Sequence, residues 1–492
     1  MAAALPTRAA IPSDAEIVGW DAVTLRAELG AGHVSAEHVT QVFLRRIAAL
    51  NRAGPALNAV IEINPDALAI ARRLDRQRGR GNLGPLHGVP VLIKANIDTA
   101  DRMATSAGSI ALAAHRARED AVVVTRLRAA GAVVLGKTNL SEWANFRSTS
   151  STSGWSSLGG QTRNPYVLDR NPCGSSSGSA VAIAARLAPL AVGTETDGSI
   201  VCPAAANGVV GVKPTLGAIS QRGIVPLARS QDTAGPLARS VGDAALLLSV
   251  LTGATGGSPQ KRESLVGLKI GVIRNYLGVG RIAAVEAGFD AALAALRDLQ
   301  ADLVDPVMPE GPPDGAEHTV LVAEFREGIN AYLSGLRKGP RTLGRLIEFN
   351  ARHAADVMPL FGQELFLEAQ AGAGTADPQY QVATAAIAAS RAALAAEFDR
   401  RDVVALVAPV NAPAWRNGLR AGDRIPVSSS SIAAVSGYPS VVLPFAMAGE
   451  LPLGIAIIGR PGTEGLLLDI AALAERLRGA FPEPRFLPTI AD

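Results

Sequence analysis

The sequence predicts an α/β protein in which helices cover both faces of one central β-sheet. The 492-residue chain is 48% hydrophobic and 18% charged, which is sufficient for a large buried core. Segments with helical spacing of apolar residues alternate with short apolar runs along most of the chain. Short strands joined to helices in this way are typical of a sheet covered on both faces. The composition shows no clear linker, so we expect a single domain over residues 1–492.

The first part of the chain, about residues 15–80, is predicted to be mainly helical. Apolar residues recur every three or four positions over 22–52, and Ser35 is expected to cap a helix in that stretch. A short strand at 59–63 and a helix at 66–78 follow. Beyond them we expect, in order, a strand at 90–95, a helix at 120–130, a strand at 132–136 and a helix at 139–145.

Residues 147–178 are rich in Ser, Thr, Gly and Asn, a composition also found in disordered linkers. The stretch contains Trp155 and Tyr166 and leads directly into an apolar segment at 180–190, which is expected to be a helix. An ordered loop beside an active site fits these features better than a linker.

We expect the sheet to be completed at about 400–480. The remaining elements are expected to be strands at 190–194, 208–213, 269–273, 403–408 and 453–458, helices at 240–252, 283–299 and 464–478, and a mostly helical region at 308–380.

The charge pattern argues against nucleic acid or a membrane as a partner. The net charge is +3, and the basic residues are scattered rather than clustered with aromatic residues. No apolar run reaches the length of a membrane span, and residues 1–14 lack the apolar core of an export signal. We therefore expect a cytoplasmic protein, a monomer or homodimer, with neither nucleic acid nor a membrane as its partner.

The cysteines and histidines do not predict a metal site or a cofactor. The histidines and the two cysteines lack the spacing of metal ligands, so we expect neither a metal nor a cofactor. Cys173 and Cys202 are too few for a disulfide scaffold. We expect them to be small buried packing residues in a reducing compartment, with a disulfide or a reactive thiol as the alternative.

Two serine-rich motifs and an isolated lysine indicate the chemistry. Ser175 lies in P-C-G-S-S-S-G-S-A at 172–180, and Ser199 lies in G-T-E-T-D-G-S-I-V-C-P at 193–203. A serine hydroxyl needs a base before it can act as a nucleophile, and no histidine lies near either motif. A phosphate-binding loop is excluded because no lysine follows Gly178.

Lys94 is the candidate base. The chain has 47 basic residues, of which only six are lysines, so arginine serves wherever a plain positive charge is needed. Lysine can lose its proton when it is desolvated, whereas arginine cannot. Lys94 ends the apolar run G-V-P-V-L-I-K, and apolar neighbours disfavour the ammonium form. By the same reasoning Lys137 also invites a specific explanation.

These motifs resemble those of the amidase signature family. The similarity extends over about residues 15–480 and is densest in a signature core at about 85–245. It implies a mixed, twisted central sheet and an enzyme that hydrolyses a small-molecule or short-peptide amide through an acyl-enzyme. The segments that carry the resemblance are the strand ending in Lys94, K-T-N-L at 137–140, the Gly/Ser loop at 172–180, T-D-G-S-I at 196–200 and G-V-V-G-V-K-P-T at 208–215.

The resemblance also implies a role for each residue of a Ser-cisSer-Lys triad. Ser199 would be the nucleophile and Lys94 the base. Ser175, preceded by a cis peptide bond from Gly174, would carry the proton between them. The backbone amides of the tight turn formed by Thr196, Asp197, Gly198 and Ser199 would form the oxyanion hole, where donors stabilise developing negative charge.

The substrate is predicted from departures within the family. Many members have glycine in place of Asp197, arginine in place of Val201 and aspartate in place of Ala95. A carboxylate would repel the oxyanion, so the side chain of Asp197 is expected to point away from it.

The departures at 197 and 201, with the Gly/Ser loop, resemble bacterial peptide amidases, which remove ammonia from C-terminal carboxamides. The alternatives are an aryl acylamidase, a broad-specificity amidase, or the ammonia-producing subunit of a tRNA-dependent amidotransferase. The residues expected to line the substrate pocket are Trp143, Asn145 and Phe146.

Overall fold

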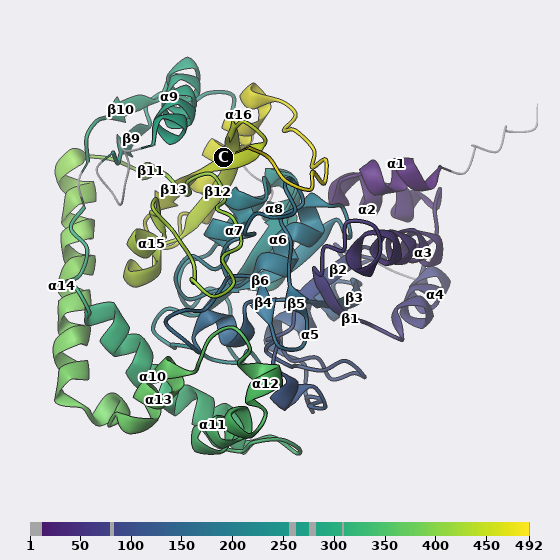
Figure 1. Cartoon of the computed structure of the whole chain (residues 1–492). Helices are drawn as coiled ribbons and strands as arrows, with labels where there is room; N and C mark the ends of the chain where they lie inside the picture. Colours follow the sequence, from purple (N-terminus) through teal and green to yellow (C-terminus); the bar gives the residue numbers. More distant parts are fainter. Residues whose placement is uncertain (1–11, 79–82, 255–261, 275–281, 308, 492) are drawn as a thin grey trace, which may run out of the picture.

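One mixed sheet forms the centre of the molecule (Figure 1). The computed structural model describes residues 12–78, 83–254, 262–274, 282–307 and 309–491. Within these residues the sheet has 11 strands in the order β1-β3-β2-β6-β8-β7-β12-β13-β11-β9-β10. The strands are β1 (Val60–Ile63), β2 (Pro90–Lys94), β3 (Val133–Thr138), β6 (Leu190–Glu195), β7 (Val210–Lys213), β8 (Thr233–Ala238), β9 (Lys269–Val272), β10 (Asp302–Val304), β11 (Ala405–Pro409), β12 (Ser440–Ala448) and β13 (Leu451–Gly459). A separate small hairpin pairs β4 (Trp155–Ser156) with β5 (Gly160–Gln161).

Strand β2 lies inside the sheet, parallel to both β3 and β6. Every residue of β2 and β6 is buried, which explains why both strands have continuous apolar runs. Since parallel neighbours end at the same edge of the sheet, Lys94 at the end of β2 lies beside the end of β6. Register pairs Ile93 with Val192, so the residues after Val192 approach the lysine.

Helices cover both faces of the sheet, as the sequence predicts. Helices α6 (Ser177–Ala184) and α7 (Val201–Ala206) contact each other and lie on one face, and α8 (Val241–Thr252) and α16 (Glu464–Arg478) contact each other on the other face. Helix α7 packs closely, because a Cβ on Gly211 of β7 would lie 2.7 Å from the Cβ of Ala204. The other helices near the sheet are α1 (Asp14–Gly19), α2 (Ala22–Ala31), α3 (Ala36–Ile47), α4 (Ala67–Gln77), α5 (Val122–Ala129) and α9 (Ala283–Asp298).

A group of helices at the lower left of Figure 1 has its own apolar cluster. Phe325 of α10 and Phe366 of α13 stack with their ring centroids 5.3 Å apart. Trp143 and Phe146 from the loop region after β3 join the same cluster. These helices therefore form a wall beside the carboxyl end of β3. They are α10 (Ala316–Ser334), α11 (Leu343–Arg352) and α13 (Glu364–Ala371), with α12 (Ala354–Val357) against α11, α14 (Pro378–Arg401) against α10 and α15 (Ser430–Ser436) against α14.

Most expected elements are confirmed within a few residues, and Ser35 caps α3 by accepting from the His38 N–H. Two expectations are wrong. The helix expected at 139–145 is a single 3₁₀ turn at Glu142–Asn145, in which Trp143 and Ala144 have φ of 54° and 55°. The helix expected at 180–190 begins at Ser177 and ends at Ala184.

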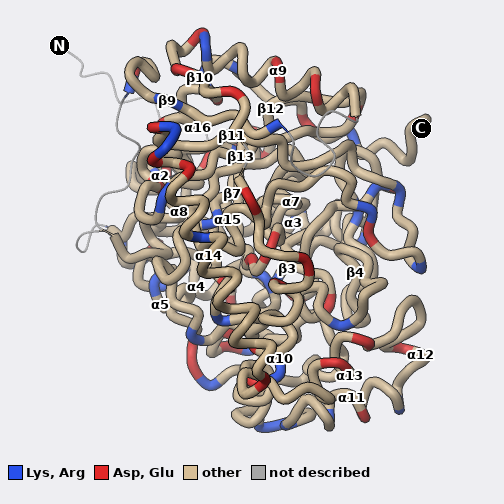
Figure 2. Tube along the Cα trace, turned by 90° about the vertical axis from the view of Figure 1, so that its left-hand side faces the viewer, with Lys and Arg blue, Asp and Glu red and all other residues tan. Residues whose placement is uncertain are grey.

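Charged residues of both signs are distributed around the molecule (Figure 2). No helix among the described residues is long and apolar enough to cross a membrane. The same residues contain no group of three or more His, Cys, Asp or Glu side chains placed to hold a metal ion. The N-terminal stretch in which an export signal was sought lies mostly outside the described residues.

Candidate active site

Lys94 occupies a closed polar site at the end of β2. Its side chain is fully buried, and Nζ donates to Ser175 Oγ at 2.7 Å and to Ser176 Oγ at 3.0 Å. It also donates to Thr194 Oγ1 at 2.9 Å and to the Thr194 carbonyl at 3.2 Å. An ammonium has three hydrogens for these four acceptors. The site thus holds one amine nitrogen among three hydroxyl groups and a carbonyl.

Burial holds the pKa of Lys94 well below its usual 10.5. The carboxylates of Glu195 and Asp232 act in the opposite direction, but their effect is smaller. Desolvation penalises the charged form of an amine. The environment of Lys94 therefore favours the neutral amine, which is the form that can accept a proton.

Lys137 and Lys213 are also fully buried, yet among the described residues neither donates a hydrogen bond to Ser175 or Ser199. Lys137 donates to the Ile97 carbonyl, and Lys213 donates to the Tyr438 carbonyl at 2.7 Å. Burial lowers the pKa of each to about 8. The specific explanation expected for Lys137 is thus its hydrogen bond to a backbone carbonyl. Lys94 is the lysine that contacts Ser175 and Ser176.

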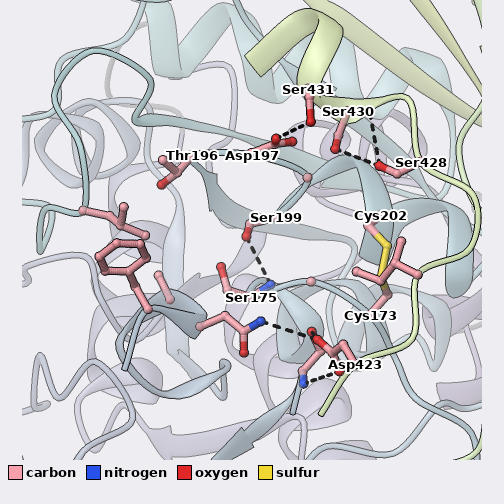
Figure 3. A pocket seen from close by; sticks show the side chains of 18 of the residues that line it. Cys173, Ser175, Thr196, Asp197, Ser199, Cys202, Asp423, Ser428, Ser430 and Ser431 are labelled. Carbon is pink, nitrogen blue, oxygen red and sulfur yellow. Dashed lines mark hydrogen bonds between the residues drawn. A yellow bond between two sulfur atoms is a disulfide. The ribbon is translucent and has the colours of Figure 1, made fainter. Parts of the chain in front are cut away.

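Ser175 and Ser199 lie next to each other in the pocket (Figure 3). Ser175 lies two residues before α6, and Ser199 lies two residues before α7. The Ser175 N–H donates to Ser199 Oγ at 3.3 Å, and the Ser176 N–H donates to the Ser199 carbonyl at 3.1 Å. The structure therefore brings together all three residues that the sequence places in the triad.

The cis peptide bond expected between Gly174 and Ser175 is not found. Among the described residues the cis peptide bond is Asp305–Pro306. The chain instead turns through two successive left-handed residues, Cys173 with φ of 57° and Gly174 with φ of 59°. This turn brings the Ser175 hydroxyl to Lys94 and its N–H to Ser199, so the contact with lysine is made without a cis bond.

The turn at 196–199 presents backbone N–H groups to the pocket. Within the part of the chain that the structure describes, the N–H groups of Asp197, Gly198 and Ser199 donate to no protein acceptor. All three residues line the pocket, and Gly198 has a left-handed φ of 77°. Free N–H groups at such a turn are what an oxyanion hole requires.

Glu195 holds this turn from below, a role that was not predicted. Its Oε2 accepts from the N–H groups of Ile200 and Val201, at 2.6 and 2.9 Å. The side chain is 1% exposed, and burial raises its pKa. Because both donors directly follow Ser199, the carboxylate fixes the position of the nucleophile candidate. The sequence feature that could have indicated this role is the position of Glu195 directly before the Thr-Asp-Gly-Ser turn.

The side chain of Asp197 lies toward Ser431, as Figure 3 shows. The Ser431 hydroxyl donates to its Oδ2 at 2.5 Å. Glu317 is also nearby. Burial is the larger cause and the Asp197 carboxylate the second cause of its raised pKa of about 8. The two carboxyl groups disfavour each other's ionisation, because like charges repel in a buried site. The Ser431 hydroxyl holds the Asp197 carboxyl group.

A pocket of about 390 Å³ opens over the two serines. Asn145 and Phe146 line it, as expected, but Trp143 does not. Trp143 is 2% exposed and packs edge-on against Phe366, with ring centroids 5.8 Å apart. The left-handed turn at 143–145 directs it into the helical wall, so its expected place in the substrate pocket is wrong. Lining residues that the sequence did not reveal include Ser153, Leu227, Leu321, Asp423, Ile425, Ser428, Ser430 and Ser431.

Cys173 and Cys202 form a disulfide, so the expectation of two free cysteines is wrong. Their Cα atoms are 5.7 Å apart, and both residues line the pocket. Cys173 lies two residues before Ser175, and Cys202 lies three residues after Ser199. Since the fold brings the two serines together, it also brings the flanking cysteines together.

The fold and this site define the chain as a hydrolase of amide bonds, and family comparison agrees. The Amidase family matches residues 38–468. The chain therefore belongs to the amidase family, and it is an enzyme that hydrolyses amide C–N bonds.

Particular relatives include both hydrolases and one component of a transferase. The structure of peptide amidase from Stenotrophomonas maltophilia is 46% identical, with a TM-score of 0.87, over 95% of this chain and 98% of that one. A probable amidase of Arabidopsis thaliana is 37% identical over 94% of this chain and 91% of its own. A glutamyl-tRNA(Gln) amidotransferase subunit from Symbiobacterium thermophilum is also 37% identical, over 90% of this chain and 93% of its own.

Proposed function

We propose that this amidase releases ammonia from C-terminal carboxamides of peptides, through an acyl-enzyme on Ser199. The observation that carries the proposal is the fully buried Lys94 Nζ, 2.7 Å from Ser175 Oγ, in a pocket shared with Ser199. The similarity to peptide amidase supports the choice of substrate.

The proposed reaction begins with a proton transfer to the lysine. Neutral Lys94 accepts the proton of the Ser175 hydroxyl, which in turn accepts that of Ser199. The Ser199 oxygen attacks the carboxamide carbon, and the N–H groups of the turn at 196–199 stabilise the oxyanion. The relay then returns the proton to the leaving ammonia, and water releases the acid in a second round.

One contact in this relay is proposed to form only with substrate. In the structure Ser199 Oγ accepts from the Ser175 N–H rather than from the Ser175 hydroxyl. Catalytic hydrogen bonds are often longer or differently directed before substrate binds. A carboxamide oxygen that binds to the turn at 196–199 would bring the two hydroxyl groups into direct contact.

The test is a measurement of ammonia release from amidated dipeptides. Acetanilides, aliphatic amides and esters are compared by kcat/KM, and acetanilides as preferred substrates would favour an aryl acylamidase instead. Lys94→Ala and Ser199→Ala should each abolish nearly all turnover while the circular dichroism spectrum is retained. A fluorophosphonate probe should label Ser199, and a protein that neither reacts with it nor releases ammonia would contradict the proposal.

A second candidate is the ammonia-producing subunit of a tRNA-dependent amidotransferase. The similarity to the Symbiobacterium thermophilum protein over 90% of the chain favours it. Activity that appears only with a partner protein, ATP and charged tRNA would support this candidate. Turnover of free peptide amides by the isolated chain would support the first.

A further inference from the structure

The catalytic pocket is acidic on two sides. Among the residues described as lining it are Asp197 and Asp423, and none of them is lysine, arginine or histidine. In Figure 3, Ser175 and Ser199 lie between these two carboxyl groups. Arg424, next to Asp423 in the chain, is exposed and does not line the pocket. An anionic acyl group would therefore meet like charge on both sides of the reacting carbonyl.

Asp423 is held in place by residues far away in the sequence. It lies on the segment between β11 and α15, and its two oxygens accept from the Ser153 N–H at 2.9 Å and the Ser153 hydroxyl at 2.5 Å. The Asn145 amide donates to the same carboxylate at 3.4 Å. Burial raises the pKa of the Asp423 carboxyl group, and the hydrogen bonds from Ser153 and Asn145 oppose that shift in part. A carboxylate has about four acceptor sites, so it can accept a further hydrogen bond from a ligand.

Asn145 provides a second acceptor beside Asp423. Its amide nitrogen donates one of its two hydrogens to Asp423, and its Oδ1 is an acceptor. That oxygen is buried and accepts no hydrogen bond from the described residues. A buried acceptor without a partner is unfavourable until a donor reaches it. Asn145 and Asp423 both line the pocket, so a substrate can supply that donor.

Asp197 is less suited to this role. Its Oδ2 accepts from Ser431, and its carboxyl group interacts with that of Glu317. Its backbone also belongs to the turn proposed as the oxyanion hole. The contacts at Asp423 and Asn145 thus point to the acyl side of the substrate, while those at Asp197 serve the turn.

We propose that Asn145 and Asp423 are specificity determinants that bind an N–H donor on the acyl portion of the substrate. That donor is the α-ammonium of an amino acid amide or the peptide N–H of a longer substrate. The preferred class is therefore α-amino acid and peptidyl amides, and amides without an α-nitrogen or with an acidic acyl group are disfavoured. The inference rests on the proposed function and names the feature of the acyl group that the pocket selects.

The test measures binding separately from catalysis. The Ser199→Ala protein is titrated by calorimetry with leucinamide, N-acetyl-leucinamide and 4-methylpentanamide, which is leucinamide without its α-nitrogen. The two nitrogen-bearing ligands should bind on the order of tenfold more tightly than 4-methylpentanamide, the factor expected of one charge-assisted hydrogen bond. Succinamate, which carries an anionic acyl group, should bind more weakly than 4-methylpentanamide.

A variant locates the effect. Asp423→Asn in the same background should lower the affinity ratio of leucinamide to 4-methylpentanamide by about tenfold, whereas the exposed control Asp298→Asn should leave it unchanged. Equal binding of leucinamide and 4-methylpentanamide by the Ser199→Ala protein would overturn the proposal even if Asp423→Asn does not fold. Selective binding by a protein whose parent hydrolyses no amide would instead contradict the proposed function and leave this inference standing.

Discussion

Replacement of Lys94 by arginine is the most direct test of the base. The structure places Nζ among four acceptors within 3.2 Å and leaves the side chain 0% exposed. Arginine keeps the capacity to donate to those acceptors. It cannot accept a proton, because it stays protonated in proteins. The variant therefore keeps the hydrogen-bond donors and removes the basicity.

The expected loss of activity follows from what a base contributes. A positioned general base typically contributes about 10²–10⁴ in rate, so we expect kcat to fall roughly 10³-fold, equivalent to about 4 kcal/mol. The planar guanidinium is also larger than the closed site of the ammonium. Overpacking of a buried site costs about 1–3 kcal/mol, so the free energy of unfolding should fall by that amount.

The assay is ammonia release from an amidated dipeptide, with the melting temperature measured in parallel. Lys269→Arg is the matched control, because Lys269 is half-buried, lies away from the pocket and pairs with Asp402 at 2.9 Å. It should retain parental activity. A folded Lys94→Arg protein with near-parental kcat would refute the reasoning, since no neutral amine would then be needed.

The remaining predictions concern pH, Glu195 and the disulfide. Burial lowers the pKa of Lys94, so kcat/KM should rise as pH increases through a value below 10.5 and then level off, because the protonated lysine cannot act as a base. A flat profile from pH 6 to 9 would count against proton transfer to Lys94 as the rate-limiting step. Glu195→Gln removes a carboxylate that raises the pKa of Lys94, so the rise in kcat/KM should move to lower pH. The same change weakens the hydrogen bonds to the turn after Ser199, so kcat should fall about tenfold. An unshifted pH profile would mean that Glu195 only positions the turn and does not affect the pKa of Lys94. The disulfide closes a loop with a sequence separation of 29, so replacement of Cys173 and Cys202 by alanine should lower the free energy of unfolding by about 3–4 kcal/mol in chemical denaturation; a smaller loss than about 1 kcal/mol would show that the loop is held by other contacts.

Much of the fold is predictable because it follows from local patterns. The apolar run ending in Lys94 is a fully buried strand, and Ser35 caps a helix as its position indicates. Strand β12 was not predicted. Its apolar residues are followed closely by those of β13, so the sequence does not show two separate strands there. Helix α14 was also missed. Its alanine-rich sequence has little contrast between faces, and its position is set by contacts with α10 and α15.

The site was predicted unevenly for a related reason. Lys94, Ser175 and Ser199 were identified by residue type, and the structure brings them together. The place of Trp143 was wrong because a left-handed turn, which its sequence does not signal, directs the ring toward Phe366. The division into about 15–80, 85–245 and 400–480, the cytoplasmic location and the oligomeric state stay predictions.

The sequence by itself indicated the groups that we propose to carry the chemistry, since a lysine among few lysines and two serines without a histidine restrict the candidates for base and nucleophile. Only the tertiary structure decided what surrounds them. Ser153 and Asp423 are 270 residues apart and meet at the pocket, and Cys173 joins Cys202 because their serines converge. Local sequence specifies the identity and the nearest conformation of a residue, whereas such long-range neighbours depend on how the whole sheet and its helices pack. Desolvation of Lys94 has the same origin, because burial is a property of the packed chain and not of the segment.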